Sequence, residues 1–118
     1  DKERVWVAET LKKVINKMEW VSEKSKNKIP YTTINGVHDD RSDQEINWSI
    51  DDGINWWCNG FWGGILWLMY HETKDEKYMK YARISEEKLD LAFEMYYGLH
   101  HDVGFMWLPT ALADYRLT

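Results

Sequence analysis

Hydrophobic positions near the start of the chain recur at the spacing of an α-helix. The apolar side chains on one face are Val7, Leu11, Val14, Met18 and Val21. Lysines, an asparagine and a glutamate fill the opposite face. A stripe of this kind is typical of an amphipathic helix with one buried side. The pattern predicts a helix over residues 3–25.

The segment 60–72 has a different character, because it is apolar on nearly every side. It reads GFWGGILWLMYHE. A helix that is hydrophobic all round is one that is buried on most sides. Gly63 and Gly64 fit this interpretation, because positions without side chains let another backbone or a ligand approach closely. The sequence therefore predicts an inner helix here.

Two more helices are predicted after this segment. The run from Thr73 to Glu76 fits a capping box, with Asp75 as an alternative N-cap. It predicts the start of an amphipathic helix that ends at Gly98, a residue typical of helix C-termini. After the short connection LHHDV, the run GFMWLPTALADYRLT predicts a second apolar helix, with Pro109 in its first turn.

The predicted layout is two αα-hairpins, each pairing an outer charged helix with an inner apolar one. No competing strand pattern appears outside residues 26–56, so we expect an all-α fold in a single domain, 1–118. The inner helices are apolar on more sides than two hairpins can cover. Exposed apolar area of that size marks an interface, so the chain either self-associates or belongs to a larger array of hairpins.

Residues 26–56 break every helical period. An irregular segment this long in a compact domain is uncommon and is often functional. It carries five aspartates, namely Asp39, Asp40, Asp43, Asp51 and Asp52. Their spacing does not match the ligands of an EF-hand, so a calcium site is not predicted. They are interpreted as turn formers and caps.

Composition narrows the possible partners. The chain has 118 residues and a net charge of −5. Because proteins bind nucleic-acid backbones through cationic patches, no nucleic-acid partner is expected. The longest apolar run, 61–70, is too short to cross a bilayer, so no membrane partner is expected. Cys58 is the only cysteine. An internal disulfide is therefore excluded, and a reducing compartment, the cytoplasm, is expected.

Few polar residues lie near the predicted inner helices. His100, His101 and Asp102 could be imagined with Cys58 as zinc ligands, but adjacent histidines point in different directions and no zinc spacing is present. No metal or other cofactor is expected, and Cys58 is interpreted as a small apolar filler. Asp102 is either a helix N-cap or a carboxylate aimed into a cleft for acid–base chemistry. The residues alone leave both alternatives open.

The eight tryptophans sharpen this picture, since aromatic faces stack on sugar rings as well as filling cores. The blocks WCNGFWGGILWLMYHETKDEKY and GLHHDVGFMWLPTALADYRLT together resemble the unsaturated glucuronyl hydrolases of glycoside hydrolase family 88. The resemblance covers nearly the whole chain and is strongest over residues 56–118. It implies an (α/α)6 barrel, a ring of hairpins whose inner helices line the axis. This chain would be the N-terminal portion of that catalytic domain, about one third of the ring.

The resemblance also implies a reaction. Members of the family hydrate the C4=C5 bond of the unsaturated uronic acid that a lyase leaves at the non-reducing end of a glycosaminoglycan oligosaccharide, and so release it. Asp102 matches the first catalytic aspartate. Trp57 and His101 match substrate-contacting positions, and Asn59 and Trp62 belong to the same block. A second catalytic aspartate lies downstream in the family and outside this chain, so the fragment alone is expected to be inactive.

Two alternatives remain. One is an unsaturated rhamnogalacturonyl hydrolase, which shares the scaffold, although HHDVGFM favours the glucuronyl branch. The other is a non-catalytic helical-hairpin module that uses the inner aromatic surface to bind a partner chain. Substitution of Asp102 distinguishes the binding module from an enzyme, because a scaffold tolerates Asp102→Asn with unchanged binding whereas an enzyme loses turnover.

Overall fold

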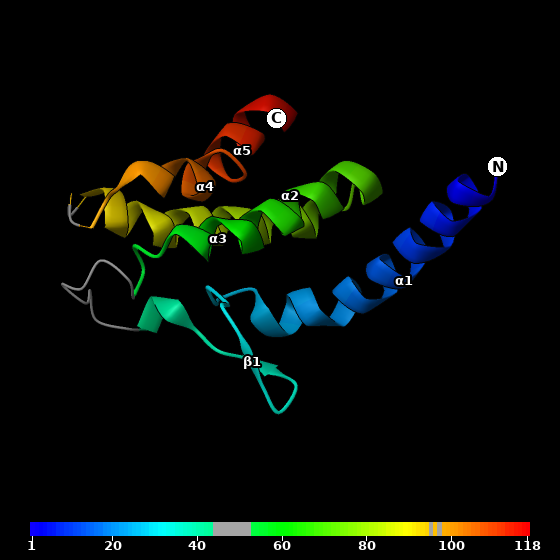
Figure 1. The fold of residues 1–118 in the computed structure, drawn as a ribbon, viewed down its shortest axis with the longest axis horizontal. Coiled ribbons are helices and arrows are strands. Elements are labelled where there is room, and N and C mark those ends of the chain that lie inside the picture. Colours follow the sequence, from blue (N-terminus) through cyan, green and yellow to red (C-terminus); the bar gives the residue numbers. More distant parts are fainter. Residues whose placement is uncertain (44–52, 95, 97) are drawn as a thin grey trace.

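The computed structural model describes residues 1–43, 53–94, 96 and 98–118, and these are mostly helical (Figure 1). The helices are α1 (Lys2–Ser25), α2 (Gly60–Thr73), α3 (Glu76–Glu94), α4 (Gly104–Trp107) and α5 (Ala111–Leu117). The strands are β1 (Thr33–Ile34) and β2 (Val37–His38). Three single-turn 3-10 helices are η1 (Arg41–Asp43), η2 (Trp57–Asn59) and η3 (His101–Val103). The all-α prediction is confirmed.

Helix α1 occupies the predicted residues, and its N-terminus is capped by Asp1, whose Oδ1 accepts from the Glu3 N–H at 3.1 Å. Among the residues that the structure describes, only its C-terminal half packs on other elements, where Met18 joins a core cluster with Trp62 of α2. The N-terminal half extends away from the other helices (Figure 1), and Val7 of the stripe and its neighbour Trp6 are 53% and 66% exposed there. Part of the predicted apolar stripe therefore has no partner among the described residues.

Helices α2 and α3 form a tight antiparallel hairpin. Lys74 takes a left-handed conformation (φ 58°), and its N–H donates to the Tyr70 carbonyl at 2.8 Å, which closes α2. Trp67 of α2 is buried in the interface, and its Nε1 donates to Oε1 of Glu86 on α3 at 2.6 Å. Burial of large aromatic side chains gives such an interface most of its stability.

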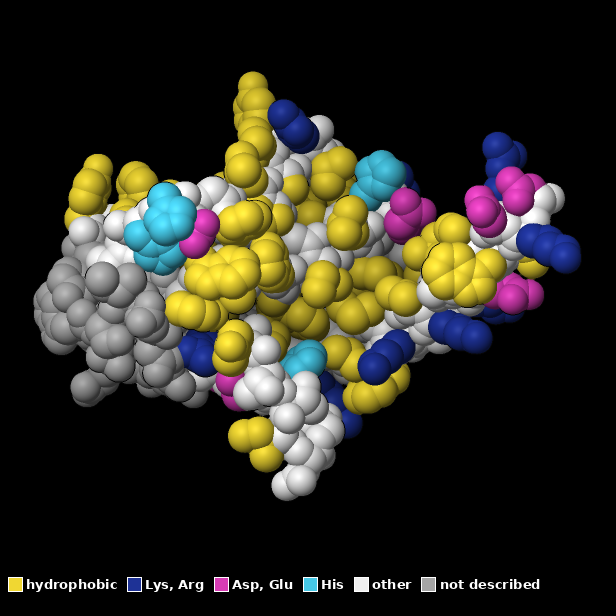
Figure 2. All heavy atoms as spheres, in the orientation of Figure 1, with side chains coloured by type: hydrophobic (Ala, Val, Ile, Leu, Met, Phe, Trp, Pro, Cys, Tyr) yellow, Lys and Arg dark blue, Asp and Glu magenta, His cyan; other side chains and the backbone are white. Residues whose placement is uncertain are grey.

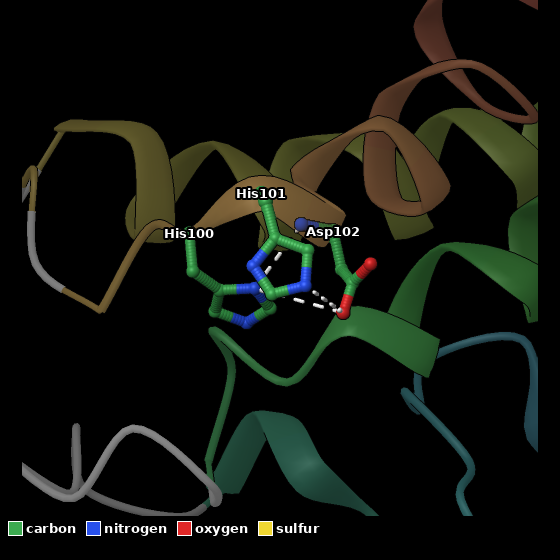
Figure 3. A group of neighbouring side chains, drawn as sticks. All are labelled: His100, His101 and Asp102. Carbon is green, nitrogen blue, oxygen red and sulfur yellow. Dashed lines mark hydrogen bonds and ion pairs between the residues drawn. The ribbon is translucent and has the colours of Figure 1, made fainter.

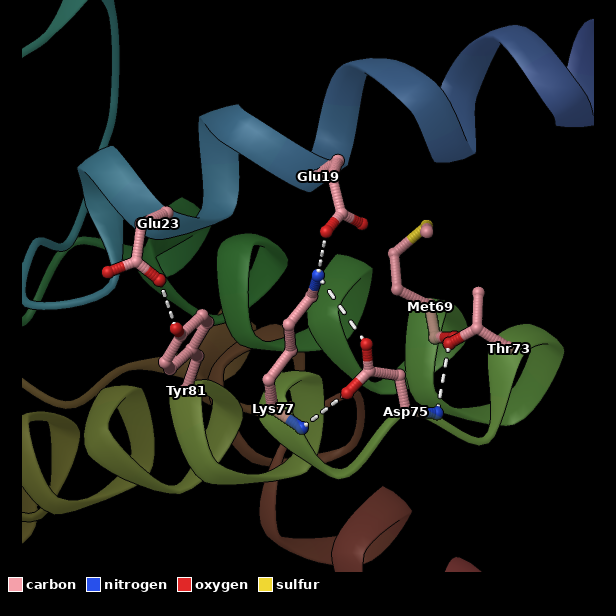
Figure 4. Close-up of polar contacts among 7 residues, drawn as sticks. All are labelled: Glu19, Glu23, Met69, Thr73, Asp75, Lys77 and Tyr81. Carbon is pink, nitrogen blue, oxygen red and sulfur yellow. Dashed lines mark hydrogen bonds and ion pairs between the residues drawn. The ribbon is translucent and has the colours of Figure 1, made fainter.

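The start of α3 corrects one prediction. The capping box at Thr73 does not form, because Thr73 is the last residue of α2 and its Oγ1 donates to the Met69 carbonyl (Figure 4). Asp75, the alternative, is the cap, and its Oδ1 accepts from the Lys77 N–H at 3.0 Å. The Lys77 ammonium also pairs with Glu19 of α1 at 2.6 Å, which ties α1 to the hairpin.

Glycines on one face of α2 admit the last segment of the chain, as predicted for Gly63 and Gly64. A Cβ on Gly60 would lie 2.3 Å from the Phe105 carbonyl oxygen and 2.6 Å from the Met106 Cα. A Cβ on Gly63 would lie 2.7 Å from a methyl group of Thr110. Side chains at these positions would hold the segment from Phe105 to Thr110 away from α2, so the close packing requires glycine.

The last two helices differ from the prediction. The segment after η3 is not one helix but two, because the chain departs from helical geometry at Thr110 (φ −108°, ψ −97°). Pro109 causes the break, since it lacks an N–H and its ring clashes with the carbonyl of the preceding turn. Helix α3 also ends at Glu94, before the predicted Gly98, because Tyr96 already takes a left-handed conformation (φ 53°).

The connection between α1 and α2 contains a β-hairpin that the sequence analysis did not predict. Thr33 pairs with His38, and Ile34 pairs with Val37. Asn35 and Gly36, with φ of 51° and 76°, form the two-residue turn that Asn-Gly favours.

Two aspartates of this connection, Asp39 and Asp40, act as the predicted turn formers. Asp39 Oδ1 accepts from the N–H groups of Tyr31 and Thr32, each at 2.8 Å. Asp40 Oδ1 accepts from the N–H groups of Ile29 and Ser42, each at 2.9 Å. The roles predicted for Asp51 and Asp52 fall outside the described residues, and the role predicted for Asp43 stays a prediction.

Much apolar surface stays exposed, as the sequence predicts. Leu68 and Leu108 are 67% and 61% exposed, and they line a groove of about 750 Å³ between α2 and α5. Figure 2 shows hydrophobic side chains gathered across the middle of this face of the molecule. None of the helices in the described residues combines the length and the apolar character that a bilayer crossing needs.

Candidate active site

The two sequence blocks meet at the N-terminal ends of the inner helices. Trp57, in η2 just before α2, contacts Phe61 of α2 and Phe105 of α4 with ring-centroid distances of 5.7 and 5.5 Å. Phe61 and Phe105 are 6.0 Å apart. We call these three residues the aromatic cluster. Phe61 and Phe105 are 42% and 47% exposed, so the cluster is partly open to solvent.

Asp102 precedes Phe105 by three residues, within η3 at the entrance to α4. Its backbone N–H donates to Nδ1 of His100 at 3.2 Å, so His100 and not Asp102 caps this turn (Figure 3). Within the described residues no backbone N–H donates to the Asp102 carboxylate. The helix-cap alternative for Asp102 is therefore wrong in this structure, and its carboxylate is left for other partners.

Those partners are the two imidazoles. Asp102 Oδ2 lies 3.4 Å from His101 Nε2 and 4.0 Å from His100 Nδ1 (Figure 3). The Asp102 side chain is 35% exposed and that of His101 is 89% exposed. A half-buried carboxylate with an accessible imidazole beside it is a group that can bind and exchange protons with a ligand.

Candidate ligand atoms of His100, His101 and Asp102 lie within 4.8 Å of one another. The two rings are thus closer than the sequence analysis predicted from adjacent histidines. The His100 Nδ1 already accepts a hydrogen bond from the backbone. Zinc sites need three or four ligands with free lone pairs, so the arrangement favours acid–base or hydrogen-bonding roles for these side chains.

Two residues of the first block are placed inside the protein. Asn59 is 1% exposed, and its Nδ2 donates to the carbonyls of Gly53 and Ile54, each at 2.9 Å. Trp62 is 6% exposed, and its ring meets the His38 ring edge-on at 5.5 Å. The substrate contacts predicted for them stay predictions.

Cys58 has the properties of the filler that the sequence predicts. Burial raises the pKa of its thiol, although a hydrogen bond with Trp56 and the charge of Arg41 act in the opposite direction. A catalytic thiol needs a lowered pKa, because the thiolate is the nucleophile.

Sequence reasoning missed Phe105 as a member of the site. Its signal was its position one helical turn after Asp102, where side chains share a face.

The chain is similar in sequence to known hydrolases. No protein-family profile and no solved structure matches the chain. It is 35% identical over 75 residues to an unsaturated glucuronyl hydrolase of Bacillus sp.. That alignment covers 63% of this chain and 20% of the relative. It is 37% identical over 62 residues to an unsaturated chondroitin disaccharide hydrolase of Streptococcus agalactiae, which covers 52% of this chain and 16% of that protein.

A third relative, from Streptococcus pneumoniae, carries the same name as the second and is 34% identical over 62 residues. The chain thus aligns with a fifth or less of the length of each of these relatives. The alignments cover at most 63% of the chain, less than the nearly complete coverage predicted. The predicted resemblance itself is confirmed: this chain is similar in sequence to a segment of the unsaturated glucuronyl hydrolases.

Proposed function

We propose that this chain is part of an unsaturated glucuronyl hydrolase and carries one side of its active site. The substrate is an oligosaccharide with an unsaturated uronic acid at its non-reducing end. The observation that carries the proposal is the Asp102 carboxylate, which does not cap the helix and lies one helical turn from the partly exposed aromatic cluster. The names of the relatives support the same substrate class.

In this reaction a proton adds to C4 of the uronic acid and the oxygen of water adds to C5. The resulting hemiketal opens and the neighbouring sugar is released. Positive charge develops at C5 and the ring oxygen when C4 takes the proton, and a nearby carboxylate stabilises such charge. Asp102 supplies that carboxylate, His101 contacts the sugar, and Trp57 offers a ring face for stacking.

The remaining machinery belongs to the longer protein. The resemblance implies a second catalytic aspartate outside this chain, so we propose that the isolated chain is inactive. We further propose that α1–α5 form two hairpins of an (α/α)6 barrel. The groove between α2 and α5 would then be covered by neighbouring inner helices, or by a second copy when the chain is alone. The single cysteine is in keeping with the cytoplasm as its location.

The test uses the longer protein and unsaturated disaccharides from chondroitin, hyaluronan and heparin. The C4=C5 bond conjugated to the carboxylate absorbs ultraviolet light, so hydration removes the absorbance. We expect the signal to fall with at least one of the three. An unchanged signal with all three, but a fall with an unsaturated rhamnogalacturonan disaccharide, would move the protein to the rhamnogalacturonyl branch. No reaction with any of them would leave the binding-module alternative.

A further inference from the structure

A second, smaller pocket lies between the C-terminal half of α1 and the β1–β2 hairpin. Its volume is about 320 Å³, which is at the low end for small-molecule sites. Three lysines contribute to its walls, namely Lys17, Lys24 and Lys28. None of the residues that the structure places around it is acidic. This is a concentration of positive charge on a chain whose net charge is −5.

The charges of these lysines are not neutralised by neighbouring carboxylates. Among the described residues, none of the three forms an ion pair with an aspartate or glutamate. The Lys24 Nζ lies 5.0 Å from the centre of the Trp20 ring. The Lys28 Nζ donates to the His38 carbonyl oxygen at 2.6 Å, a neutral acceptor that leaves its charge in place.

His38, at the rim of the same pocket, responds to this environment. Its pKa is lowered first by burial and then by the charges of Lys28 and Lys17, while Asp39 acts in the opposite direction. The Nδ1 of His38 is held by the Ser25 hydroxyl at 2.8 Å, so the imidazole sits at a fixed place beside the lysines. A local positive potential of this kind attracts anions.

A structural role at the end of α1 does not account for the whole group. Lysines in the last turn of a helix interact favourably with its C-terminal carbonyls, and Lys24 is in that turn. Lys17 lies two turns earlier, on the same face as Lys24 because seven residues make nearly two full turns. It therefore faces the pocket without being close to the helix terminus.

The pocket also has the features of a sugar site. Trp20 is 51% exposed, with its ring beside the Lys24 ammonium, and Thr33 adds a hydroxyl group. An adjoining pocket of about 430 Å³ shares Lys17, Thr33 and His38 with it and extends to Phe61 of the aromatic cluster. The two pockets thus lead from the lysines towards the candidate active site.

We propose that the pocket between α1 and the β1–β2 hairpin binds an oxyanion that is carried by an acidic sugar. This oxyanion is either a sulfate ester or a carboxylate. The anion lies among the ammonium groups of Lys17, Lys24 and Lys28, and the sugar ring packs on Trp20. The choice of an acidic saccharide rests on the proposed function. The anion site itself does not, because it follows from the charges and the shape of the pocket.

The experiment is isothermal titration calorimetry of the purified 118-residue chain at low ionic strength. Sodium sulfate, a sulfated chondroitin tetrasaccharide and a neutral chito-oligosaccharide are titrated separately. We expect both anions to bind, the tetrasaccharide more tightly than sulfate because of the added ring contact, and the neutral sugar not to bind. Binding should weaken as salt is added, since exposed charges are screened.

Lysine variants assign the site. Lys17→Gln and Lys24→Gln should each weaken binding of the tetrasaccharide by about two- to fivefold, the range of partly exposed charge pairs. Lys12→Gln is the matched control, because it removes the same charge roughly a third of a turn around α1. Lys28→Gln also removes the bond to the His38 carbonyl, so it is used only if its circular dichroism matches that of the parent.

Each outcome decides the proposal. Absence of anion binding to the parent, or equal weakening by Lys12→Gln, would overturn it. Lysine-dependent binding of sulfate without tighter binding of the tetrasaccharide would retain an anion site and reject the sugar contact. Because no turnover is measured, these results are separate from the ultraviolet assay that tests the proposed function.

Discussion

Replacement of Gly60 by alanine tests the packing that brings the two halves of the candidate site together. The Cβ of Gly60→Ala would lie 2.3 Å from the Phe105 carbonyl oxygen, 2.5 Å from that of Met106 and 2.6 Å from the Met106 Cα. All three are backbone atoms, so no side-chain rotation relieves the contact. Helix α4 must move away from α2, and Phe105 moves with it relative to Trp57.

The expected loss of stability combines two opposing effects. Inserting a methyl group into a well-packed interface destabilises by about 1–3 kcal/mol, with rigid surroundings at the upper end. Alanine gains up to about 1 kcal/mol over glycine within a helix, and less at the first residue of α2. We therefore expect Gly60→Ala to lower the free energy of unfolding by about 2 kcal/mol. For a chain of this size, that lowers Tm by about 8 °C.

Gly104→Ala is the matched control at the start of α4. Its Cβ would meet only the Leu108 side chain, at 3.4 Å from Cδ1, which is an ordinary contact. Its helical φ of −56° suits alanine, so this variant should be unchanged or more stable by up to about 1 kcal/mol. Urea unfolding followed by circular dichroism measures both. Equal stability of Gly60→Ala and the parent would refute the close approach of α4 to α2.

Three further predictions concern the rest of the chain. Asp75→Ala should lower the free energy of unfolding by about 1 kcal/mol through loss of the α3 cap. Asp75→Asn should keep most of the stabilisation that the cap gives, and urea titration of both variants measures this. Burial raises the pKa of Glu86 above its ordinary 4.5, so its charged form opposes folding as the pH rises through the raised value. Glu86→Gln, which keeps an acceptor for Trp67, should therefore stabilise the chain at about pH 7 and have little effect at about pH 4. An equal effect at both pH values would contradict this. Sedimentation of the isolated chain should show self-association through the groove of Leu68 and Leu108, and a monomer with those side chains exposed would contradict it.

Local sequence patterns were enough to predict α1 and α2, because the hydrophobic pattern within each helix fixes its position. The apolar stripe of α1 and the apolar run of α2 gave their positions closely, because hydrophobic periodicity reports directly on which face is buried. The exposure of Trp6 and Leu68 was also foreseeable, since two hairpins cannot cover that much apolar surface.

The differences arise where neighbouring signals compete or where contacts are distant in sequence. Thr73 and Asp75 are both good caps, and only the end of α2 decides between them. Pro109 is acceptable in a first turn, but η3 and α4 begin the helical segment earlier and leave the proline at a break. The Asn35–Gly36 turn was visible in the sequence, but its strands are too short to show alternation.

The candidate site was predictable in its location and less so in its geometry. The resemblance placed Trp57 and Asp102 together, and the structure joins their segments through Phe105. That His100 caps the turn, so that the Asp102 carboxylate pairs with the imidazoles and not with the backbone, depends on side-chain geometry that residue spacing does not contain. The burial of Asn59 likewise depends on its contact with Gly53 and Ile54, which no local pattern predicts.

The most direct test of the central claim compares Asp102→Asn with Asp90→Asn in the longer protein. Both variants exchange one carboxylate for an amide, but Asp90 is exposed on the outer helix α3. Loss of the unsaturated-uronate absorbance gives kcat, and binding of the unreacted disaccharide is measured separately. We expect Asp102→Asn to lower kcat by about 10²- to 10³-fold, the contribution of a positioned group that stabilises charge in the transition state, with its fold and substrate binding retained. Asp90→Asn should match the parent. A kcat for Asp102→Asn equal to that of Asp90→Asn would contradict the assignment of Asp102 as a catalytic residue.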